Sequence, residues 1–341
     1  MTRPLLDVRD LHVIFRIHSQ AAMPWTKPRS LYAVNGVNFT LNQGETLGIV
    51  GESGSGKSTL ARALIGLADA TGKAEWIDGK DLIAMSPRQM MKYRSDIQMV
   101  FQDPLASLNP RMTVGQIIAE PLITHRPGLR KAEVKERVKA MMEKVGLLPN
   151  QINRYPHEFS GGQCQRIGIA RALIVEPKLI ICDEPVSALD VSIQAQVINL
   201  LIRLQRELGL SLIFIAHDLS VVKHISDRVM VLYLGKVMEI ASSTDLYSAP
   251  QHPYTQALLS AVPVPDPDFD PTNTVVPLHG ELPSPFNPPS GCVFRTRCPR
   301  AQARCASEVP LLLGNDQQVA CHFPGPLTAA EIARARQSEV A

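Results

Sequence analysis

The chain has 341 residues, of which 45% are hydrophobic, and 35 basic against 32 acidic residues leave a formal net charge of +3. This length and composition predict a globular protein, either one large domain or a domain with an appendage. The near balance of charge argues against a dedicated nucleic-acid binder. No apolar run approaches the roughly 20 residues that span a bilayer, and the first residues lack the layout of a signal peptide. We therefore expect a cytoplasmic protein that serves a membrane only by docking onto separate membrane subunits.

Short apolar runs alternate with helical patterns over residues 1–260, which is typical of a sheet covered by helices. The mostly helical pattern at about 88–176 predicts a helical subdomain inserted into this α/β core. After residue 261, repeated prolines predict a linker and a small C-terminal appendage over 261–341. The apolar runs that predict buried strands are 46–50, 179–182, 212–216 and 229–234, and apolar spacing predicts helices within 134–145 and 193–208.

Residues 51–58, GESGSGKS, match the phosphate-loop pattern G-x-x-x-x-G-K-S/T between a strand-like and a helix-like segment. Glycines let the backbone N–H groups and the helix N-terminus face phosphates. Lys57 is expected to reach the β- and γ-phosphates, and Ser58 to ligate magnesium. The flanking segments argue against the alternative, a plain Gly/Ser turn. The predicted nucleotide contacts are Gly51, Glu52, Ser53, Gly54, Ser55, Gly56, Lys57, Ser58 and Thr59.

A second apolar segment, residues 178–185, ends in two acids. Asp183 is placed to hold magnesium, directly or through water. Glu184 is the candidate to orient and deprotonate an attacking water. In isolation such a pair could simply cap the next helix. Beside a phosphate loop it predicts hydrolysis of a nucleoside triphosphate.

The first 260 residues or so resemble the ABC ATPase family, because residues 159–163, FSGGQ, are similar to its signature and the other motifs follow in order. The resemblance implies a P-loop core with an antiparallel β subdomain and an inserted helical subdomain. It also implies a head-to-tail pair of chains around two ATP molecules, in which a lone chain hydrolyses ATP poorly. Cys164 stands where close relatives have a polar residue, and we hypothesise that its oxidation impairs activity. The signature residues expected to close over the partner's nucleotide are Ser160, Gly161, Gly162 and Gln163.

Further positions match the family pattern. Gln102 matches the glutamine that contacts magnesium and the attacking water, in a loop that senses the membrane partner. His217 matches the histidine at the γ-phosphate, and Asp190 lies in the loop through which paired subunits communicate. The resemblance therefore implies Glu184, His217 and Gln102 as catalytic residues and Ser58, Gln102 and Asp183 as magnesium ligands.

An aromatic residue upstream of the phosphate loop is expected to stack on the adenine. Phe15 is the first choice and Tyr32 the second, and either could instead be a core aromatic.

Four of the six cysteines, Cys292, Cys298, Cys305 and Cys321, gather in the proline-rich tail. In a reducing cytosol such a group indicates a metal site more often than disulfides, and a metal could organise a segment with little core. The spacing leaves zinc and iron–sulfur both open. Four reduced cysteines without metal are the alternative.

The tail residues 252–259, 280–285 and 291–292 resemble the C-terminal extension of ATP-binding subunits from dipeptide and oligopeptide importers. This resemblance implies ATP and Mg²⁺ as cofactors, with a 4Fe–4S cluster on the four cysteines. It also implies a second ABC ATPase subunit, two membrane permease subunits and an extracytoplasmic solute-binding protein as partners, at the cytoplasmic face of the inner membrane and without nucleic acid. The long connection between residues 15 and 33 resembles the subunit that pairs with a paralogous ATPase rather than with itself.

The sequence thus predicts an ATPase that powers peptide import. The alternative, a soluble ABC ATPase acting on nucleic acid or ribosomes, lacks the long coiled coils or second cassette typical of that class. A regulator that binds nucleotide without turnover conflicts with the presence of Glu184. The cargo remains open among dipeptides, longer peptides, glutathione-like thiols and metal chelates. The sequence also leaves open whether the ATPase pair is a homodimer or a heterodimer, and whether the cysteines have a structural or a redox role.

Overall fold

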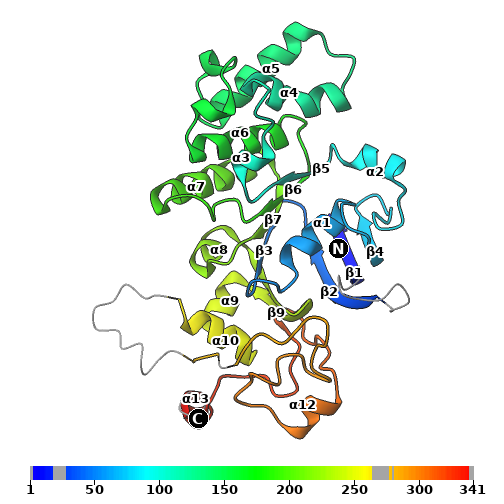
Figure 1. Ribbon diagram of the computed structural model, residues 1–341, viewed down its shortest axis with the longest axis vertical. Helices are drawn as coiled ribbons and strands as arrows, with labels where there is room; N and C mark the ends of the chain where they lie inside the picture. Colours follow the sequence, from blue (N-terminus) through cyan, green and yellow to red (C-terminus); the bar gives the residue numbers. More distant parts are fainter. Residues whose placement is uncertain (1–2, 18–27, 263–275, 279, 338–341) are drawn as a thin grey trace.

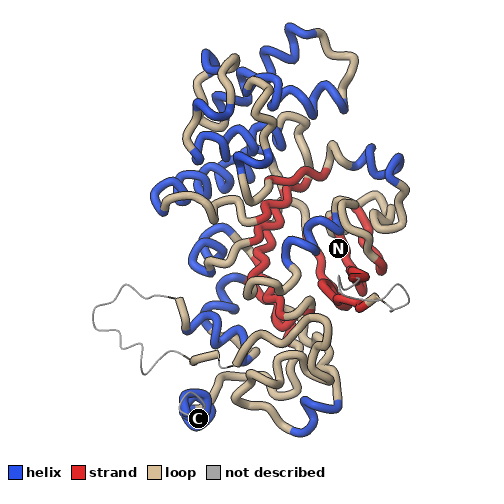
Figure 2. Tube along the Cα trace, in the orientation of Figure 1, coloured by secondary structure: helices blue, strands red, loops and turns tan. Residues whose placement is uncertain are grey.

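The computed structural model of the chain describes residues 3–17, 28–262, 276–278 and 280–337. A twisted sheet runs through the molecule with helices along one side and a smaller sheet on the other (Figure 1, Figure 2). Much of the 15–33 connection and the first part of the proline-rich linker lie outside the described residues. Among those described, the main sheet has seven strands in the spatial order β10 (Gln318–Val319), β9 (Lys236–Ser242), β8 (Arg228–Tyr233), β3 (Thr46–Val50), β7 (Ser211–Ile215), β6 (Leu179–Asp183) and β5 (Ile97–Val100).

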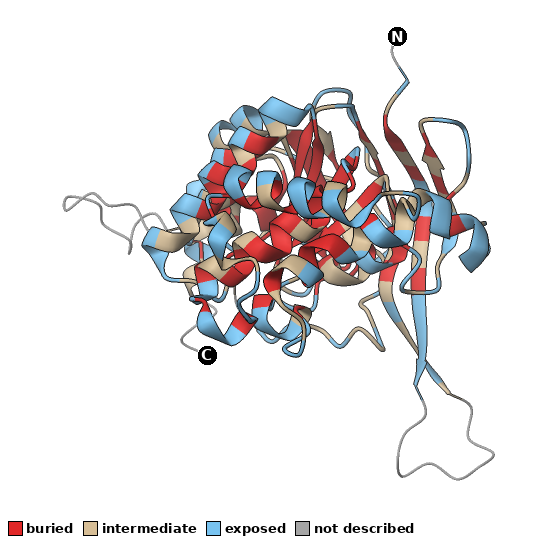
Figure 3. Cartoon of the chain, turned by 90° about the horizontal axis from the view of Figure 1, so that it is seen from above, coloured by how far each residue is buried: buried red, intermediate tan, exposed pale blue. Residues whose placement is uncertain are grey.

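The strands from β8 to β5 are parallel, and each is covered on both faces. Every residue of β3, β6 and β7 is buried, which is why these segments read as unbroken apolar runs. Along β7, Phe214 faces the core under the helices, whereas Ile213 and Ile215 face the core under the smaller sheet. Figure 3 shows how the buried residues concentrate in this layer. The four predicted strands agree with the observed ones to within one residue at each end.

The smaller sheet is antiparallel, as the family resemblance implies. Its order is β2 (Arg29–Leu41), β1 (Leu6–Ile17) and β4 (Thr71–Trp76), with register shifts along β1. Helix α1 (Lys57–Leu64) lies between this sheet and the main one and packs its buried side chains into their common core. At the far end of the β1–β2 hairpin the side chains of Phe15 and Tyr32 are partly exposed.

A group of helices occupies one end of the molecule (Figure 1). Helix α5 (Lys131–Lys144) covers all but the last residue of the predicted 134–145 segment, and α7 (Val191–Leu208) covers the whole predicted 193–208 segment. One strand, β5, lies inside the predicted 88–176 range and pairs in register with β6, so this range is not helical throughout. The helices up to α8 are α2 (Pro87–Tyr93), α3 (Pro104–Ser107), α4 (Val114–His125), α5 (Lys131–Lys144), α6 (Gly161–Leu173), α7 (Val191–Leu208) and α8 (Leu219–Ile225), with short 3-10 turns at Pro149–Gln151 and Pro156–Glu158.

The C-terminal extension lies at the opposite end of the molecule (Figure 1) and joins the main core. Strand β10 pairs with β9, and the fully buried Phe294 makes ring contacts with Tyr233 and Tyr254 at centroid distances of 5.3 and 5.2 Å. Such aromatic contacts add to the stabilisation from area burial. The helices of this end are α9 (Ser243–Ser248), α10 (Pro253–Ser260), α12 (Ala303–Ser307) and α13 (Ala329–Gln337).

His252 gives the fold a pH dependence. Its buried ring accepts a hydrogen bond from the Tyr254 N–H at the start of α10, and burial lowers the pKa of His252 to about 3. Between pH 6.5 and 3 the unfolded chain binds a proton here that the folded chain does not, so stability falls as the pH falls, by at most about 1.4 kcal/mol per pH unit. An asparagine at this position can accept the same hydrogen bond without titrating. We therefore expect the free energy of unfolding of His252→Asn, measured with urea, to decline less between pH 6.5 and 4.5 than that of the unaltered chain. An identical pH slope in both proteins would refute this assignment.

Candidate functional site

The phosphate loop and the predicted catalytic residues meet at the carboxyl ends of the parallel strands. The phosphate loop joins β3 to α1, and Gln102, Glu184 and His217 follow β5, β6 and β7. In an open α/β sheet this edge is where ligands bind. A cavity of about 450 Å³ lies there, lined by Phe15, Leu31, Ala33, Ser53, Gly54, Ser55, Gly56, Lys57, Ser58, Thr59, Gln102, Glu184 and Pro285.

Two glycines of the loop are required by the close approach of neighbouring backbone. A Cβ on Gly51 would lie 2.1 Å from the Leu232 carbonyl oxygen, and one on Gly56 would lie 2.2 Å from the Ala33 carbonyl oxygen. Gly56 also has φ of 101° at the N-terminal cap of α1, a conformation that other residues rarely adopt. Larger residues at these two positions would therefore deform the loop.

Lys57 is the buried cation of the site. Its Nζ donates to the carbonyl oxygens of Gly51 at 2.8 Å and Glu52 at 3.1 Å, which holds the ammonium inside the loop. Burial lowers the pKa of Lys57, and the carboxylates of Glu184, Asp183 and Glu52 act in the opposite direction. A triphosphate in this loop would meet a preplaced positive charge and a helix N-terminus.

The predicted magnesium ligands and catalytic residues form a polar group made of two hydrogen-bonded pairs, with His217 beside the second pair. The Ser58 hydroxyl donates to Asp183 Oδ1 at 2.7 Å, and the Gln102 side-chain amide donates to Glu184 Oε2 at 3.0 Å. The Nδ1 of His217 lies 3.7 Å from the same Glu184 oxygen. Burial raises the pKa of Asp183, an effect that a bound dication would reverse.

The hydroxyl, carboxylate and amide of this group supply the oxygen ligands that Mg²⁺ prefers, so the site fits this ion. Glu184 itself has φ of 46°, and non-glycine residues held in this left-handed region cluster at active sites. When bound, magnesium would neutralise charge on the phosphates. The protein groups would position them and the attacking water.

Phe15 and Pro285 line the cavity, whereas Tyr32 does not. Phe15 pairs across the hairpin with Leu31, another lining residue, while Tyr32 pairs with Ile14. The structure therefore favours Phe15 over Tyr32 for contact with a base. Pro285 belongs to the C-terminal extension, and no sequence pattern pointed to it.

The signature residues lie away from this cavity, and none of them lines it. Ser160 caps α6 by accepting from the Gln163 N–H, and both it and Gly161 are exposed. Gly162 faces Ile193, and a Cβ there would lie 2.4 Å from the Ile193 side chain. An exposed, glycine-led helix start outside its own chain's cavity is consistent with action on a second chain.

Asp190 and Cys164 also lie outside the cavity. Asp190 occupies the N-terminal cap position of α7 and is exposed. Cys164 is fully buried and directs its thiol at the Pro156 carbonyl, and burial raises its pKa. Buried thiols of this kind react slowly, so the position gives no support to the hypothesis of oxidative control.

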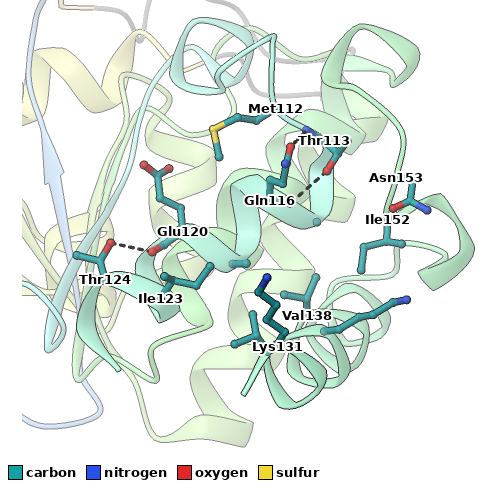
Figure 4. Close-up of a pocket in the computed structure, with 14 residues that line it drawn as sticks. Met112, Thr113, Gln116, Glu120, Ile123, Thr124, Lys131, Val138, Ile152 and Asn153 are labelled. Atoms are coloured by element: carbon teal, nitrogen blue, oxygen red, sulfur yellow. Dashed lines mark hydrogen bonds between the residues drawn. The ribbon is translucent and has the colours of Figure 1, made fainter. Parts of the chain in front are cut away.

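Sequence reasoning missed a groove on the helical end of the molecule. This cavity of about 520 Å³ lies between α4 and α5, and Figure 4 shows its lining. Glu120 and Lys131 bring opposite charges to it, and the apolar Ile123 at its wall is 55% exposed. A smaller hollow of about 360 Å³ shares Glu120 and extends to Phe101, the neighbour of Gln102. The groove therefore continues toward the nucleotide edge of the sheet.

The four tail cysteines form no disulfide and lie near one another. The Cys292 N–H donates to the Cys305 carbonyl at 2.8 Å, and burial raises the pKa of Cys298 to about 12, with the other three thiols adding to the effect. Backbone N–H groups face the sulfurs of Cys292, Cys298 and Cys321. Yet no three histidine, cysteine or acidic side chains of the described residues stand in an arrangement that holds a metal ion. The geometry therefore gives no direct support for the predicted iron–sulfur cluster.

Fold and site together define a P-loop nucleotide-binding protein of the ATP-binding cassette class. The family model described as "ABC transporter" matches residues 34–187, and that described as "Oligopeptide/dipeptide transporter, C-terminal region" matches residues 238–305. The chain is 65% identical over 325 residues to the Oligopeptide transport ATP-binding protein OppF of Escherichia coli, covering 95% of this chain and 97% of that protein. The Haemophilus influenzae protein of the same name is 63% identical, over 93% and 96%. This chain belongs to the ABC transporter family, within its oligopeptide-transport group of ATP-binding proteins.

A solved structure supports the same assignment. The ATP-binding cassette MJ0796, in a dimeric post-hydrolysis state bound to ADP and Pi, superposes with a TM-score of 0.62 at 29% identity. The match covers 70% of this chain and 98% of that one. None of the helices in the described ranges combines the length and apolar character that a bilayer crossing requires.

We expect Glu184→Gln to retain ATP binding and to lower turnover by about 10²- to 10⁴-fold, because the amide cannot accept a proton from water. Binding of a fluorescent ATP analogue and phosphate release by the assembled ATPase measure the two effects. Glu207→Gln, an exposed acid of α7 paired with Arg203, is the matched control and should leave both unchanged. Turnover near the normal rate in Glu184→Gln would overturn the assigned base.

Phe15→Ala should weaken ATP binding by about 5- to 150-fold, since stacking on one base is worth roughly 1–3 kcal/mol. Tyr32→Ala removes an aromatic of similar exposure from the other side of the hairpin and should leave the affinity near normal. Titration with ATP and with inorganic triphosphate separates a base contact from a phosphate contact. Equal losses in the two variants would contradict the choice of Phe15.

Proposed function

We propose that this chain is the ATP-hydrolysing subunit that powers oligopeptide import through a membrane ABC transporter. The observation that carries the proposal is the joint presence of the polar group at Ser58, Asp183 and Glu184 and of a C-terminal region of the oligopeptide-transporter type. The polar group would catalyse ATP hydrolysis. The C-terminal region distinguishes the ATP-binding subunits of oligopeptide transporters from ABC ATPases with other functions. The alternative, a soluble ABC ATPase acting on nucleic acid or ribosomes, has no such support.

The proposed catalytic unit is a head-to-tail pair of chains, in which Ser160 and Gly161 of one chain close over ATP held by the other. The exposed start of α6, remote from its own cavity, supports this arrangement. The second chain would be a paralogous ATP-binding subunit. Lys57, magnesium and the partner's signature would neutralise charge at the γ-phosphate, while Gln102, Glu184 and His217 would position the water.

The remaining proposed partners are two permease subunits and an extracytoplasmic solute-binding protein, with this chain at the cytoplasmic face of the membrane. The groove between α4 and α5 suits a cytoplasmic segment of a permease because it combines exposed apolar wall with Glu120 and Lys131. Its continuation toward Phe101 and Gln102 would link docking to the catalytic edge. Closure of the nucleotide pair would then move the docked segment.

The test is reconstitution of the complex in lipid vesicles, with uptake of labelled tripeptides and peptide-stimulated ATP turnover as readouts. Ile123→Asp should retain ATP binding but lose stimulation at least tenfold, because it places a charge on the apolar wall of the groove. Leu311→Asp, at an apolar residue of the extension that is 70% exposed, is the control. Turnover stimulated by RNA or ribosomes and indifferent to permeases would overturn the proposal.

We propose further that the four tail cysteines hold a metal centre, with a 4Fe–4S cluster as the first choice. The proposal starts from the tail's likeness to peptide-importer subunits and from the proximity of the four thiols, whereas the described residues show no arrangement that holds a metal ion.

Metal, acid-labile sulfide and visible absorption of anaerobically purified protein test this second proposal. We expect about four irons and four sulfides per chain, lost on Cys298→Ser but kept on Cys164→Ser. Detection of one zinc per chain without sulfide would show that the four cysteines form a zinc site and would refute the cluster. Colourless protein without either metal would leave four reduced thiols and refute both.

A further inference from the structure

The C-terminal extension makes a direct ionic contact with the phosphate loop. Arg297, between Cys292 and Cys298, donates through both terminal nitrogens to the two carboxylate oxygens of Glu52, at 2.6 and 3.1 Å. The Arg297 side chain is only 7% exposed and its guanidinium also lies 5.9 Å from the centre of the Tyr233 ring. Bidentate pairs of this kind are the strong, directional form of an ion pair, and a buried member is costly to leave unpaired.

A second contact fixes the same residue of the loop. The Glu52 backbone N–H donates to the Tyr254 hydroxyl at 3.0 Å, and Tyr254 packs against Tyr233 and Phe294. Phe294, like Arg297, belongs to the extension. The backbone of Glu52 is therefore held by Tyr254, which packs against Phe294 of the extension. Its side chain is held by Arg297 of the extension.

The charge of Glu52 acts on the phosphate site. Its carbonyl oxygen accepts from Lys57, and its carboxylate is one of three that interact electrostatically with the Lys57 ammonium. An unpaired carboxylate here would compete with the phosphates for Lys57 and repel them. Paired with Arg297, the same carboxylate is neutralised, and Glu52 does not line the nucleotide cavity.

We propose that Arg297 is a positioning residue of the nucleotide site, which neutralises and orients Glu52 and so sets the affinity of the phosphate loop for ATP. The inference rests on the proposed function only in that the loop binds ATP. It extends the nucleotide site across 245 residues of sequence into the extension. The Arg297–Glu52 ion pair and ATP binding by the phosphate loop are thereby coupled within one chain.

The experiment measures equilibrium binding of the non-hydrolysable analogue AMP-PNP with Mg²⁺ to the full-length chain. Arg297→Met should weaken binding about tenfold or more, because the uncompensated Glu52 charge would repel the phosphates and compete with them for Lys57. Adding Glu52→Gln to Arg297→Met should recover most of the affinity, since it removes the charge that Arg297 neutralises. In the assembled transporter Arg297→Met should raise the KM for ATP while kcat stays near normal.

Arg300→Met is the matched control. Arg300 also forms a two-nitrogen pair within the extension, with Glu331 at 2.8 and 2.9 Å, and both side chains are largely buried. Its loss should lower thermal stability as Arg297→Met does, without changing AMP-PNP affinity. Equal affinity losses in the two variants, or no recovery on adding Glu52→Gln, would overturn the proposal. Failure of the unaltered chain to bind AMP-PNP would instead refute the proposed function.

Discussion

Two backbone carbonyls leave no room for a side chain at Gly51 and Gly56, and the shape of the phosphate loop follows from that exclusion. The Leu232 carbonyl belongs to the main sheet and the Ala33 carbonyl to the antiparallel sheet. The loop is therefore clamped between the two sheets, and its shape depends on how they pack together over α1. With the loop held in this way, Lys57 turns inward and its ammonium bonds to the Gly51 carbonyl, which places a positive charge at the nucleotide cavity.

Each carboxylate around the phosphate loop is paired with a hydrogen-bond donor or a positive charge. Ser58 bonds to Asp183, Gln102 bonds to Glu184, and Arg297 neutralises Glu52. Each pair satisfies groups that would otherwise be costly to bury or to hold close together. The first two pairs lie where magnesium and water are expected, so ligand binding must exchange their hydrogen bonds. The third is held by the extension and can persist when the nucleotide arrives.

Much of the fold was predictable because its physical signals are local. β3, β6 and β7 are buried on both faces, so their apolar runs end where the strands end, and the phosphate loop is recognised from a contiguous pattern. β5 is short and surrounded by helical patterns, which concealed it. The choice between Phe15 and Tyr32 depends on the register shifts of β1, which a two-residue period cannot supply.

The parts of the site contributed by Pro285 and Arg297 were not predictable for a different reason. They reach the loop through folding of a proline-rich segment more than two hundred residues away, and no periodicity relates positions so far apart. Composition indicated only that this segment has little regular structure. It could not show that Phe294 fills a place in the main core.

Strand β10 determines whether the ATPase part of the chain can be separated from the C-terminal extension. It covers the outer edge of β9, and the extension covers the faces of Tyr233 and Tyr254 through Phe294. A chain shortened to end at residue 260 would therefore present an open strand edge beside exposed aromatic rings. Such edges pair readily with other chains, so the shortened protein would tend to aggregate even though its ATPase motifs are complete.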